Sequence, residues 1–416
     1  MTIDEERLRD TFETYTAIGA TEDGGLNRPA LSDADGRARD QFCADLQALG
    51  LSTIVDEVGN IFGRQSGEFP DDRPVLIGSH LDSQPRGGRY DGQLGVAIAL
   101  ETMRAFETGM PAQQRPLEIV NWTNEEGARF TLAPLGSGVF GGLYTVKEAL
   151  ADTDGDGVSV AQALEAIDYD GDSPCEPHPL SAHLELHIEQ GPVLDQQDVP
   201  VGIVEAGVGM TWLEVTVRGK SNHAGTTPMH ARRDPMVSAT RVVDELRTLP
   251  AAYAEDVVVT VGELTVSPGV INVIPEEVVF TLDIRSPDDE TRRAVLDRIE
   301  RTLAHETTVR ETTYETETLL SMDRTLFASV VRQHAVAACE DREIPFELLT
   351  SGAGHDAMCL AGTVPTGMLF VPSVDGVSHT PQEYIEWKDV LAGARVFAET
   401  TRRLACTVES PKDNHG

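Results

Sequence analysis

Lysine is nearly absent from this sequence of 416 residues, in which only Lys147, Lys220, Lys388 and Lys412 occur. Lysine and arginine together number 33, against 69 aspartates and glutamates, which gives a formal net charge of −36 at pH 7. A surface this acidic repels the phosphates of nucleic acids and the headgroups of anionic membranes. We therefore expect neither a nucleic acid nor a membrane as a partner.

The acidic excess also bears on the conditions in which the chain folds. Like charges at this density destabilise a compact state unless salt screens them, and the Debye length falls to about 3 Å in 1 M salt. The composition therefore predicts a halophilic protein adapted to a salt-rich cytoplasm. The alternative is an acidic protein of ordinary salt requirement, which would stay folded at low salt.

Long apolar runs and paired cysteines are missing as well. No stretch of about 18 apolar residues is present, so a transmembrane helix is not expected. The first ten residues, MTIDEERLRD, lack the basic start and apolar core of a secretory signal. The five cysteines show no CxxC spacing, which predicts neither a disulfide framework nor a thiolate zinc site. Together these absences favour a cytoplasmic protein.

What is present is typical of a globular α/β protein. The length suffices for two or three domains, and 40% of the residues are hydrophobic. Short apolar segments at 75–77, 117–120 and 184–188 predict strands, and helical periodicity separates the first two. Each ends next to polar residues, as in folds whose sites lie beyond the carboxyl ends of the strands.

The pattern changes near residue 210, where a second type of domain is predicted. We expect strands at 212–217, 257–264, 278–284 and 307–314. A helix that starts at Asp234 lies between the first two strands, and a helix at 291–303 lies between the last two. This β-α-β-β-α-β order is that of a ferredoxin-like α+β unit. We interpret residues 210–319 as an inserted lid and dimerisation domain. Residues 1–209 and 320–416 then form a discontinuous catalytic domain with a mixed sheet. A helix at 326–339 and a strand at 364–371 complete the core of that domain.

The first chemistry-bearing segment follows the apolar residues 75–77. His80 and Asp82 are two residues apart, so an extended backbone places them on one face, where the carboxylate can orient a metal-binding imidazole. Asp91 follows in a glycine-rich stretch, and its two oxygens could bridge two cations. Alone, the His-x-Asp pair is explained equally well as a hydrogen-bonded surface pair.

A second segment, Asn124-Glu125-Glu126-Gly127, follows the next predicted strand. Adjacent carboxylates at a strand end point in opposite directions, so one can bind a metal while the other acts as a general base. Glu-Glu pairs are common in an acidic chain and are usually solvated, so this segment is also weak evidence by itself.

His187 and His379 complete the candidate ligands. A single histidine in a strand is more often a satisfied core residue than a ligand. The combination carries more weight, because three imidazoles and two carboxylates, one of them bridging, suit a pair of zinc-like cations about 3.5–4 Å apart.

Five segments, in the same order, resemble those of the N-carbamoyl-L-amino-acid amidohydrolases of the hydantoinase/carbamoylase type, within a clan of dinuclear zinc peptidases and deacylases. The resemblance extends over roughly residues 5–403. It rests on His80-x-Asp82, Arg89-Tyr90-Asp91-Gly92, Asn124-Glu125-Glu126-Gly127, His187-Ile188-Glu189-Gln190-Gly191 and Ser221-Asn222-His223-Ala224-Gly225-Thr226-Thr227-Pro228-Met229.

The resemblance implies two divalent cations per subunit, zinc first, although manganese, cobalt and nickel suit the same ligands. It implies Glu125 as the general base. A histidine at position 187 distinguishes the amidohydrolases from their peptidase relatives, which usually have a carboxylate there. The implied ligands are His80, Asp91 and His187 for one cation, and Asp91, Glu126 and His379 for the other.

The same resemblance implies four substrate-binding residues, which are Gln190, His223, Asn272 and Arg285. An arginine can hold a substrate carboxylate through two parallel hydrogen bonds. The alternative for Arg285 is a structural salt bridge to Asp283 or Glu290.

His223 has a second implication. It resembles the family histidine that enters the site from the neighbouring subunit and stabilises the oxyanion, so the chain is expected to form a homodimer. His355, in Ser-Gly-Ala-Gly-His-Asp, is a candidate for a residue that contacts the ligands without binding a cation itself.

The implied activity is hydrolysis of the ureido C–N bond of N-carbamoyl-L-amino acids to amino acid, ammonia and carbon dioxide. The same motifs occur in allantoate, ureidoglycolate and N-carbamoyl-β-alanine amidohydrolases, which therefore remain alternatives. A zinc aminopeptidase or aminoacylase is disfavoured by His187. A non-catalytic binding protein on this scaffold is disfavoured because every ligand and Glu125 are present.

Overall fold

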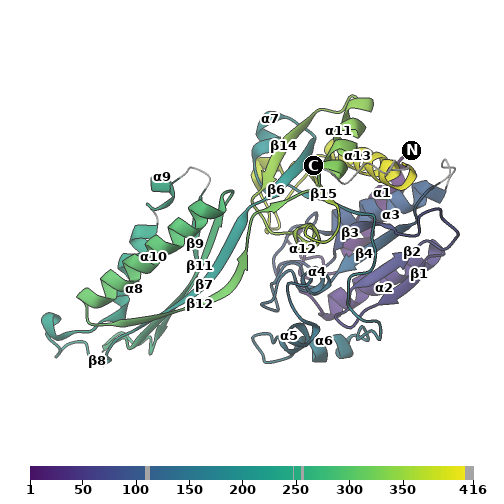
Figure 1. Ribbon diagram of the computed structural model, residues 1–416. Coiled ribbons are helices and arrows are strands. Elements are labelled where there is room, and N and C mark those ends of the chain that lie inside the picture. The colour runs from purple at the N-terminus through teal and green to yellow at the C-terminus, as the bar shows by residue number, and fades with distance from the viewer. Residues whose placement is uncertain (108–112, 247, 254–256, 408–416) are drawn as a thin grey trace. The chain divides into compact units, whose positions relative to one another are not determined.

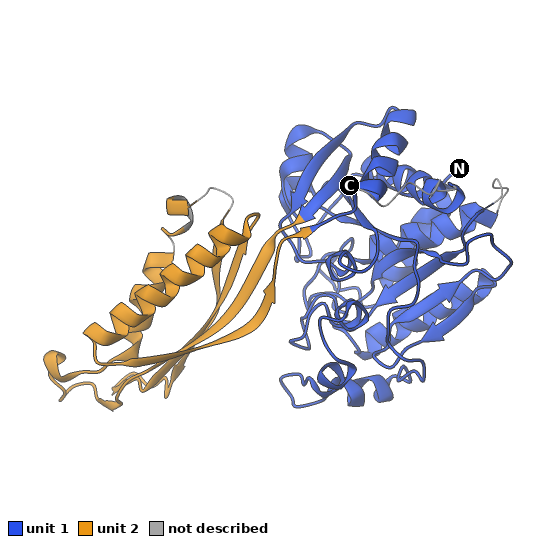
Figure 2. Cartoon of the chain, viewed as in Figure 1, with its two compact units in different colours: residues 1–206, 326–416 blue, residues 207–325 orange. Residues whose placement is uncertain are grey.

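The computed structural model describes residues 1–107, 113–246, 248–253 and 257–407. The chain divides into two compact units, a larger one of residues 1–206 and 326–416 and a smaller one of residues 207–325 (Figure 2). The boundaries expected from the sequence, 210 and 319, fall a few residues inside the smaller unit.

A mixed sheet of nine strands forms the centre of the larger unit (Figure 1). Its order is β1-β2-β4-β3-β5-β15-β6-β13, and β14 pairs with β6. The four strands β4, β3, β5 and β15 are parallel neighbours. The strands are β1 (Ser52–Val55), β2 (Ile61–Arg64), β3 (Val75–His80), β4 (Leu117–Trp122), β5 (Ala182–Ile188), β6 (Val201–Gly207), β13 (Thr325–Leu326), β14 (Phe346–Ser351) and β15 (Thr366–Val371).

Helices cover this sheet because their apolar faces need burial. Helix α3 is buried along nearly all of its length and packs on β3, β4 and β5, and α13 packs on α3, β15 and β5. Ser32 caps α2, as its position before the apolar periodicity predicts. The helices are α1 (Glu5–Ala17), α2 (Asp33–Ala48), α3 (Gln93–Glu107), α4 (Leu135–Gly141), α5 (Val146–Ala151), α6 (Val160–Ala166), α7 (Val193–Gln197), α11 (Ser329–Asp341), α12 (Asp356–Leu360) and α13 (Trp387–Cys406).

The smaller unit is an α+β sandwich with its own apolar core. Its antiparallel sheet has the order β12-β7-β11-β9, and α8 and α10 pack on one face of it (Figure 1). The short strands β8 and β10 pair separately. The elements are β7 (Gly209–Arg218), β8 (Asn222–His223), α8 (Pro235–Leu246), α9 (Pro250–Tyr253), β9 (Val258–Ser267), β10 (Val273–Ile274), β11 (Glu277–Ser286), α10 (Asp289–Val309) and β12 (Thr313–Met322).

One sequence-based expectation about this unit is wrong. The segment 307–314 was predicted as a strand, but residues up to Val309 continue helix α10 and the strand β12 begins at Thr313. The β-branched run from Thr307 favours a strand locally. The helix continues because it buries the Thr307 side chain, whose hydroxyl is satisfied by the carbonyl of Leu303 at 2.7 Å.

Two absences can be stated for the described residues. No helix among them is both long and apolar enough to cross a membrane. The five cysteines, all of which lie in that part of the chain, form no disulfide.

Candidate metal centre and active site

The parallel strands of the larger unit bring the predicted ligands to one edge of the sheet. Because β4, β3, β5 and β15 run in the same direction, their carboxyl ends lie together. His80 is the last residue of β3 and His187 the last but one of β5. Glu126 and His379 lie in the segments that follow β4 and β15.

His80, Asp91 and His187 form the first group of candidate ligands. All three side chains are buried, and the ligand atoms that they offer lie within 4.8 Å of one another. The Nε2 atoms of His187 and His80 lie 3.0 and 3.6 Å from Oδ1 of Asp91 and 3.4 Å from each other. One cation could contact all three side chains.

The second nitrogen of each imidazole shows which atom is free to bind a cation. Nδ1 of His80 donates to the carbonyl oxygen of Asp82, and Nδ1 of His187 donates to that of Ile188, both over 3.1 Å. A carbonyl oxygen only accepts, so the neutral rings have their proton on Nδ1 and a lone pair on Nε2. Two lone pairs and a carboxylate oxygen thus converge in a buried space, which a divalent cation would stabilise.

Asp91, Glu126 and His379 form the second group. Nε2 of His379 lies 3.3 Å from Oδ2 of Asp91 and 3.3 Å from Oε2 of Glu126. Asp91 therefore directs one oxygen to each group, which is the arrangement that a carboxylate bridging two cations requires. The nitrogen and oxygen donors fit zinc, manganese, cobalt or nickel, and no sulfur ligand takes part in either group.

Asp82 contacts both His80 and the segment that follows β4. Its carboxylate Oδ1 lies 3.6 Å from Nδ1 of His80, and its backbone carbonyl accepts from the same nitrogen at 3.1 Å. The carboxylate oxygens also accept from the backbone N–H groups of Glu125 and Glu126, each at 3.2 Å. The reason is geometric, because the two N–H groups after β4 point at the buried carboxylate and would otherwise lack a partner. Asp82 thus ties the two candidate-ligand segments together.

Glu383 is a buried residue of the site that the sequence analysis missed. Its Oε1 accepts from the backbone N–H groups of Tyr90 and Asp91 at 2.8 and 3.2 Å, and Oε2 accepts from the hydroxyl of Ser378 at 3.0 Å. Burial, followed by the charge of Asp91, raises the pKa of Glu383 to about 7. Glu383 connects the loop of Asp91 to the loop of His379, but a single glutamate among 69 acidic residues gives no sequence signal.

Glu125 lies beside the first group without belonging to either group. Its Oε2 is 3.6 Å from Nε2 of His80, and its Oε1 is 3.9 Å from Nδ1 of His355. Burial raises the pKa of Glu125 well above its usual range; His80 opposes this rise and Asp356 adds to it. A carboxyl group of raised pKa beside a cation site is suited to accepting and returning a proton.

Gln190 and His355 also lie within this centre. The Gln190 amide donates to Oδ2 of Asp91 at 2.7 Å, and its nitrogen lies 3.2 Å from Nε2 of His379. The ring of His355 lies 4.5 Å from that of His187. Gln190 and His379 have positive φ angles of 57°, as does Asn124 at 52°. Left-handed backbone at three non-glycine residues is costly and is concentrated at functional sites.

The remaining predicted residues belong to the smaller unit. His223 on β8 pairs with Val273 on β10, and the N–H of Ala224 donates to the carbonyl of Asn272 at 3.0 Å. His223 and Asn272 are therefore neighbours, and both are exposed. Arg285, on β11, bonds Asp283 at distances down to 2.7 Å, which is the structural alternative considered for it.

Cation binding at the second group is expected to strengthen as the pH rises towards 9. The hydrogen bond to Asp91, opposed by burial and supported by Glu126, raises the pKa of His379 to about 9. At pH 7 a cation must displace this proton, so binding weakens about tenfold per pH unit below 9. Calorimetric titration of the metal-free protein with zinc, in two buffers of different ionisation enthalpy, counts the protons released. An affinity that is the same at pH 7 and pH 8.5 would contradict this expectation.

Comparison with known proteins identifies the family of the chain. The profile of peptidase family M20/M25/M40, a metal-dependent family, matches residues 76–403. An N-carbamoyl-L-amino acid amidohydrolase of Geobacillus stearothermophilus is 40% identical over 96% of this chain and 98% of its own length. An allantoate amidohydrolase of Escherichia coli is 33% identical over the same shares. The crystal structure of a hydantoinase/carbamoylase family amidase from Burkholderia vietnamiensis, 39% identical, superposes with a TM-score of 0.92 over 97% of this chain and 98% of that chain. The chain belongs to peptidase family M20/M25/M40.

Proposed function

We propose that the protein is a metal-dependent amidohydrolase that cleaves the carbamoyl C–N bond of N-carbamoyl-L-amino acids. One water is consumed, and the products are the free amino acid, ammonia and carbon dioxide. The observation that carries the proposal is the pair of ligand groups sharing Asp91 and including His187, with the unliganded carboxylate of Glu125 beside them. Relatives that bear this activity in their names are 36–40% identical over nearly the whole chain.

The two ligand groups would hold two divalent cations, and zinc is the metal that we propose first. When bound, such a pair polarises a carbonyl oxygen and lowers the pKa of water towards about 7. The chain's own contribution is proton transfer. The Glu125 carboxylate would accept the proton of the attacking water and then deliver it to the departing nitrogen.

Four further residues would bind the substrate. Gln190 and Asn272 offer amides to the ureido group, and His223 would donate to the carbonyl oxygen as negative charge develops there. Arg285 would hold the α-carboxylate through two hydrogen bonds. Asp283 bonds the guanidinium in the structure, so we expect the substrate carboxylate to displace Asp283 from Arg285.

The experiment is a substrate panel. Chelated protein is reloaded with zinc, manganese, cobalt or nickel and assayed for ammonia release from N-carbamoyl-L-amino acids, allantoate, ureidoglycolate and N-carbamoyl-β-alanine. We expect the highest kcat/KM with an N-carbamoyl-L-amino acid. Metal-loaded protein that leaves every ureido compound intact would overturn the proposal.

Allantoate hydrolysis is the second candidate. It is favoured by relatives named allantoate amidohydrolase or deiminase that are 32–34% identical over 90% or more of this chain. Both substrates have a ureido group and a carboxylate, so the same anchors would serve them. The panel separates them directly, because a kcat/KM for allantoate above that for every carbamoyl amino acid would assign this second function.

We also propose that the chain works as a homodimer in which residues 210–319 supply the lid and the subunit interface. His223 and Asn272 are exposed on this unit, which suits residues that complete a site on another surface. Mixing two inactive variants, His223→Asn and Glu125→Gln, tests this arrangement. If His223 serves the partner subunit, mixed dimers regain part of the activity; a mixture that stays inactive, or a monomer in light scattering, would refute the proposal.

The net charge of −36 leads us to propose a halophilic, cytoplasmic enzyme. Screening of the acidic surface by salt should stabilise the folded state. We predict that dialysis from about 2 M to about 0.1 M potassium chloride lowers the unfolding temperature, measured by circular dichroism, and that activity falls with it. An unfolding temperature independent of salt would identify an ordinary acidic protein.

A further inference from the structure

The turn that follows His223 fixes the protonation of its ring. The backbone N–H of Gly225 donates to Nδ1 of His223 at 3.0 Å. Only a nitrogen without a proton can accept, so the neutral ring has its proton on Nε2. The Nε2–H group is then a hydrogen-bond donor, which is the form needed to bind an oxygen that gains negative charge.

Arg232 bonds two backbone carbonyls of this turn. Its Nη2 donates to the carbonyl of Ala224 at 2.6 Å and its Nε donates to the carbonyl of Thr227 at 3.1 Å. The hydroxyl of Thr227 in turn donates to the carbonyl of His223 at 2.7 Å. The rigid fork of one guanidinium thus brackets residues 224–227, including the Gly225 N–H that selects the tautomer.

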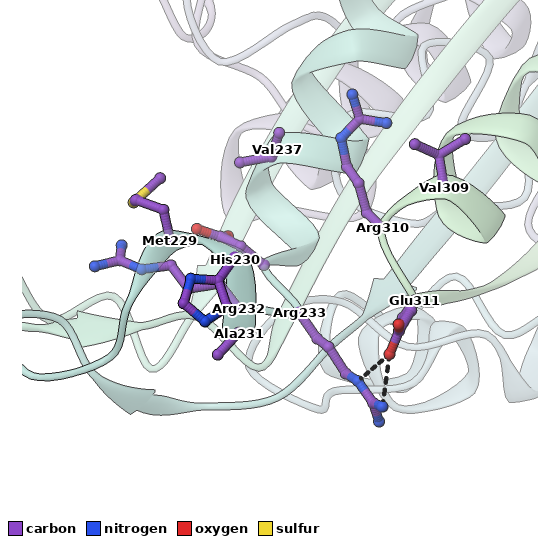
Figure 3. Close-up of a pocket in the computed structure, with 10 residues that line it drawn as sticks. Met229, His230, Ala231, Arg232, Arg233, Val237, Val309, Arg310 and Glu311 are labelled. Atoms are coloured by element: carbon purple, nitrogen blue, oxygen red, sulfur yellow. Dashed lines mark hydrogen bonds and ion pairs between the residues drawn. The ribbon is translucent and has the colours of Figure 1, made fainter.

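The neighbouring arginine, Arg233, forms an ion pair with Glu311. Arg232 and Arg233 both line a pocket of about 500 Å³ in the smaller unit, where Figure 3 shows Arg233 directed at Glu311. That ion pair is exposed, with distances of 2.6 and 2.9 Å, and among the described residues the Arg233 side chain donates no hydrogen bond to residues 223–227. Arg233 therefore offers a matched control of the same charge and the adjacent position.

We propose that Arg232 is a positioning residue that holds the His223 turn so that His223 presents Nε2–H to the carbonyl oxygen of the substrate. The proposal rests on the proposed function, in which His223 stabilises the developing oxyanion. Arg232 does not touch the substrate. It acts by keeping the Gly225 N–H against Nδ1, so that neither the ring orientation nor the tautomer has to be selected during the reaction.

The test compares Arg232→Gln, Arg232→Lys and Arg233→Gln. We expect Arg232→Gln to lower kcat about tenfold to a hundredfold with little change in KM, because the affected bond forms in the transition state. Arg232→Lys should not rescue kcat, since one ammonium cannot reproduce the two-pronged fork. Arg233→Gln should keep the wild-type kcat. Bound metal and the circular dichroism spectrum are measured for each protein. If Arg232→Gln does not fold, the kcat of Arg232→Lys is the test of the proposal.

A second readout does not depend on catalysis. Nitrogen-15 NMR of protein labelled at histidine reports the tautomer of each ring, and the signal missing in His223→Asn identifies residue 223. Wild-type protein should show the proton on Nε2 only, and the Arg232 variants should show both tautomers. Folded Arg232 variants with wild-type kcat and one tautomer would overturn the inference. Inactivity of the wild type on every ureido compound would instead overturn the proposed function, and the NMR result would still stand on its own.

Discussion

Replacement of Glu125 by glutamine is expected to lower kcat by about a hundredfold or more while both cations remain bound. The amide has nearly the shape of the carboxylate but cannot accept a proton. Glu125 belongs to neither ligand group, and its Oε2 lies 3.6 Å from Nε2 of His80. The loss should therefore appear in turnover and not in metal content, measured by mass spectrometry of the purified protein.

Glu126→Gln is the matched control, since it changes the adjacent residue in the same way. Glu126 belongs to the second ligand group, with Oε2 at 3.3 Å from Nε2 of His379. This variant should lose cation at that group as well as activity. A Glu125→Gln enzyme with nearly wild-type turnover, or one that has lost its cations, would remove Glu125 from the role of proton carrier.

The five candidate ligands that the structure brings together were expected from the motifs that resemble the amidohydrolases, and local signals support four of these positions. His80, Glu126 and His187 stand at or next to the ends of apolar strands, and parallel strands place such ends together. Asp91, the candidate bridging ligand, lies in a glycine-rich loop. Strand periodicity and loop composition are short-range features, so they can be recognised in the sequence without knowledge of tertiary contacts.

The supporting contacts could not be predicted in this way. Glu383 accepts hydrogen bonds from residues about 290 positions earlier in the chain. A local sequence pattern cannot predict a contact between segments so far apart. Similarly, the sequence left open whether Arg285 pairs with Asp283, because two residues apart on a strand places them on one face without fixing the rotamer. The end of helix α10 was misread for a related reason, since burial of Thr307 outweighed its β-branched preference.

Gly92 is a position where a single methyl group should disturb a candidate ligand directly. Its φ angle is +74°, and a Cβ there would overlap the imidazole of His80. That ring is fully buried and held through Nδ1 by the Asp82 carbonyl, so it has no free space into which to move. We expect Gly92→Ala to weaken cation binding at the first group by about a hundredfold, the scale observed when the support of a metal ligand is lost.

Gly157 provides the comparison that separates this steric effect from backbone strain. Its φ angle is +81°, but a Cβ there would meet no atom within 4 Å. Alanine at either position incurs the penalty of a left-handed conformation, about 1–2 kcal/mol. Only Gly92→Ala should also change zinc affinity in calorimetry and activity in the assay. Equal zinc affinities for the two variants would mean that the close approach of Gly92 to His80 does not hold the ligand in place.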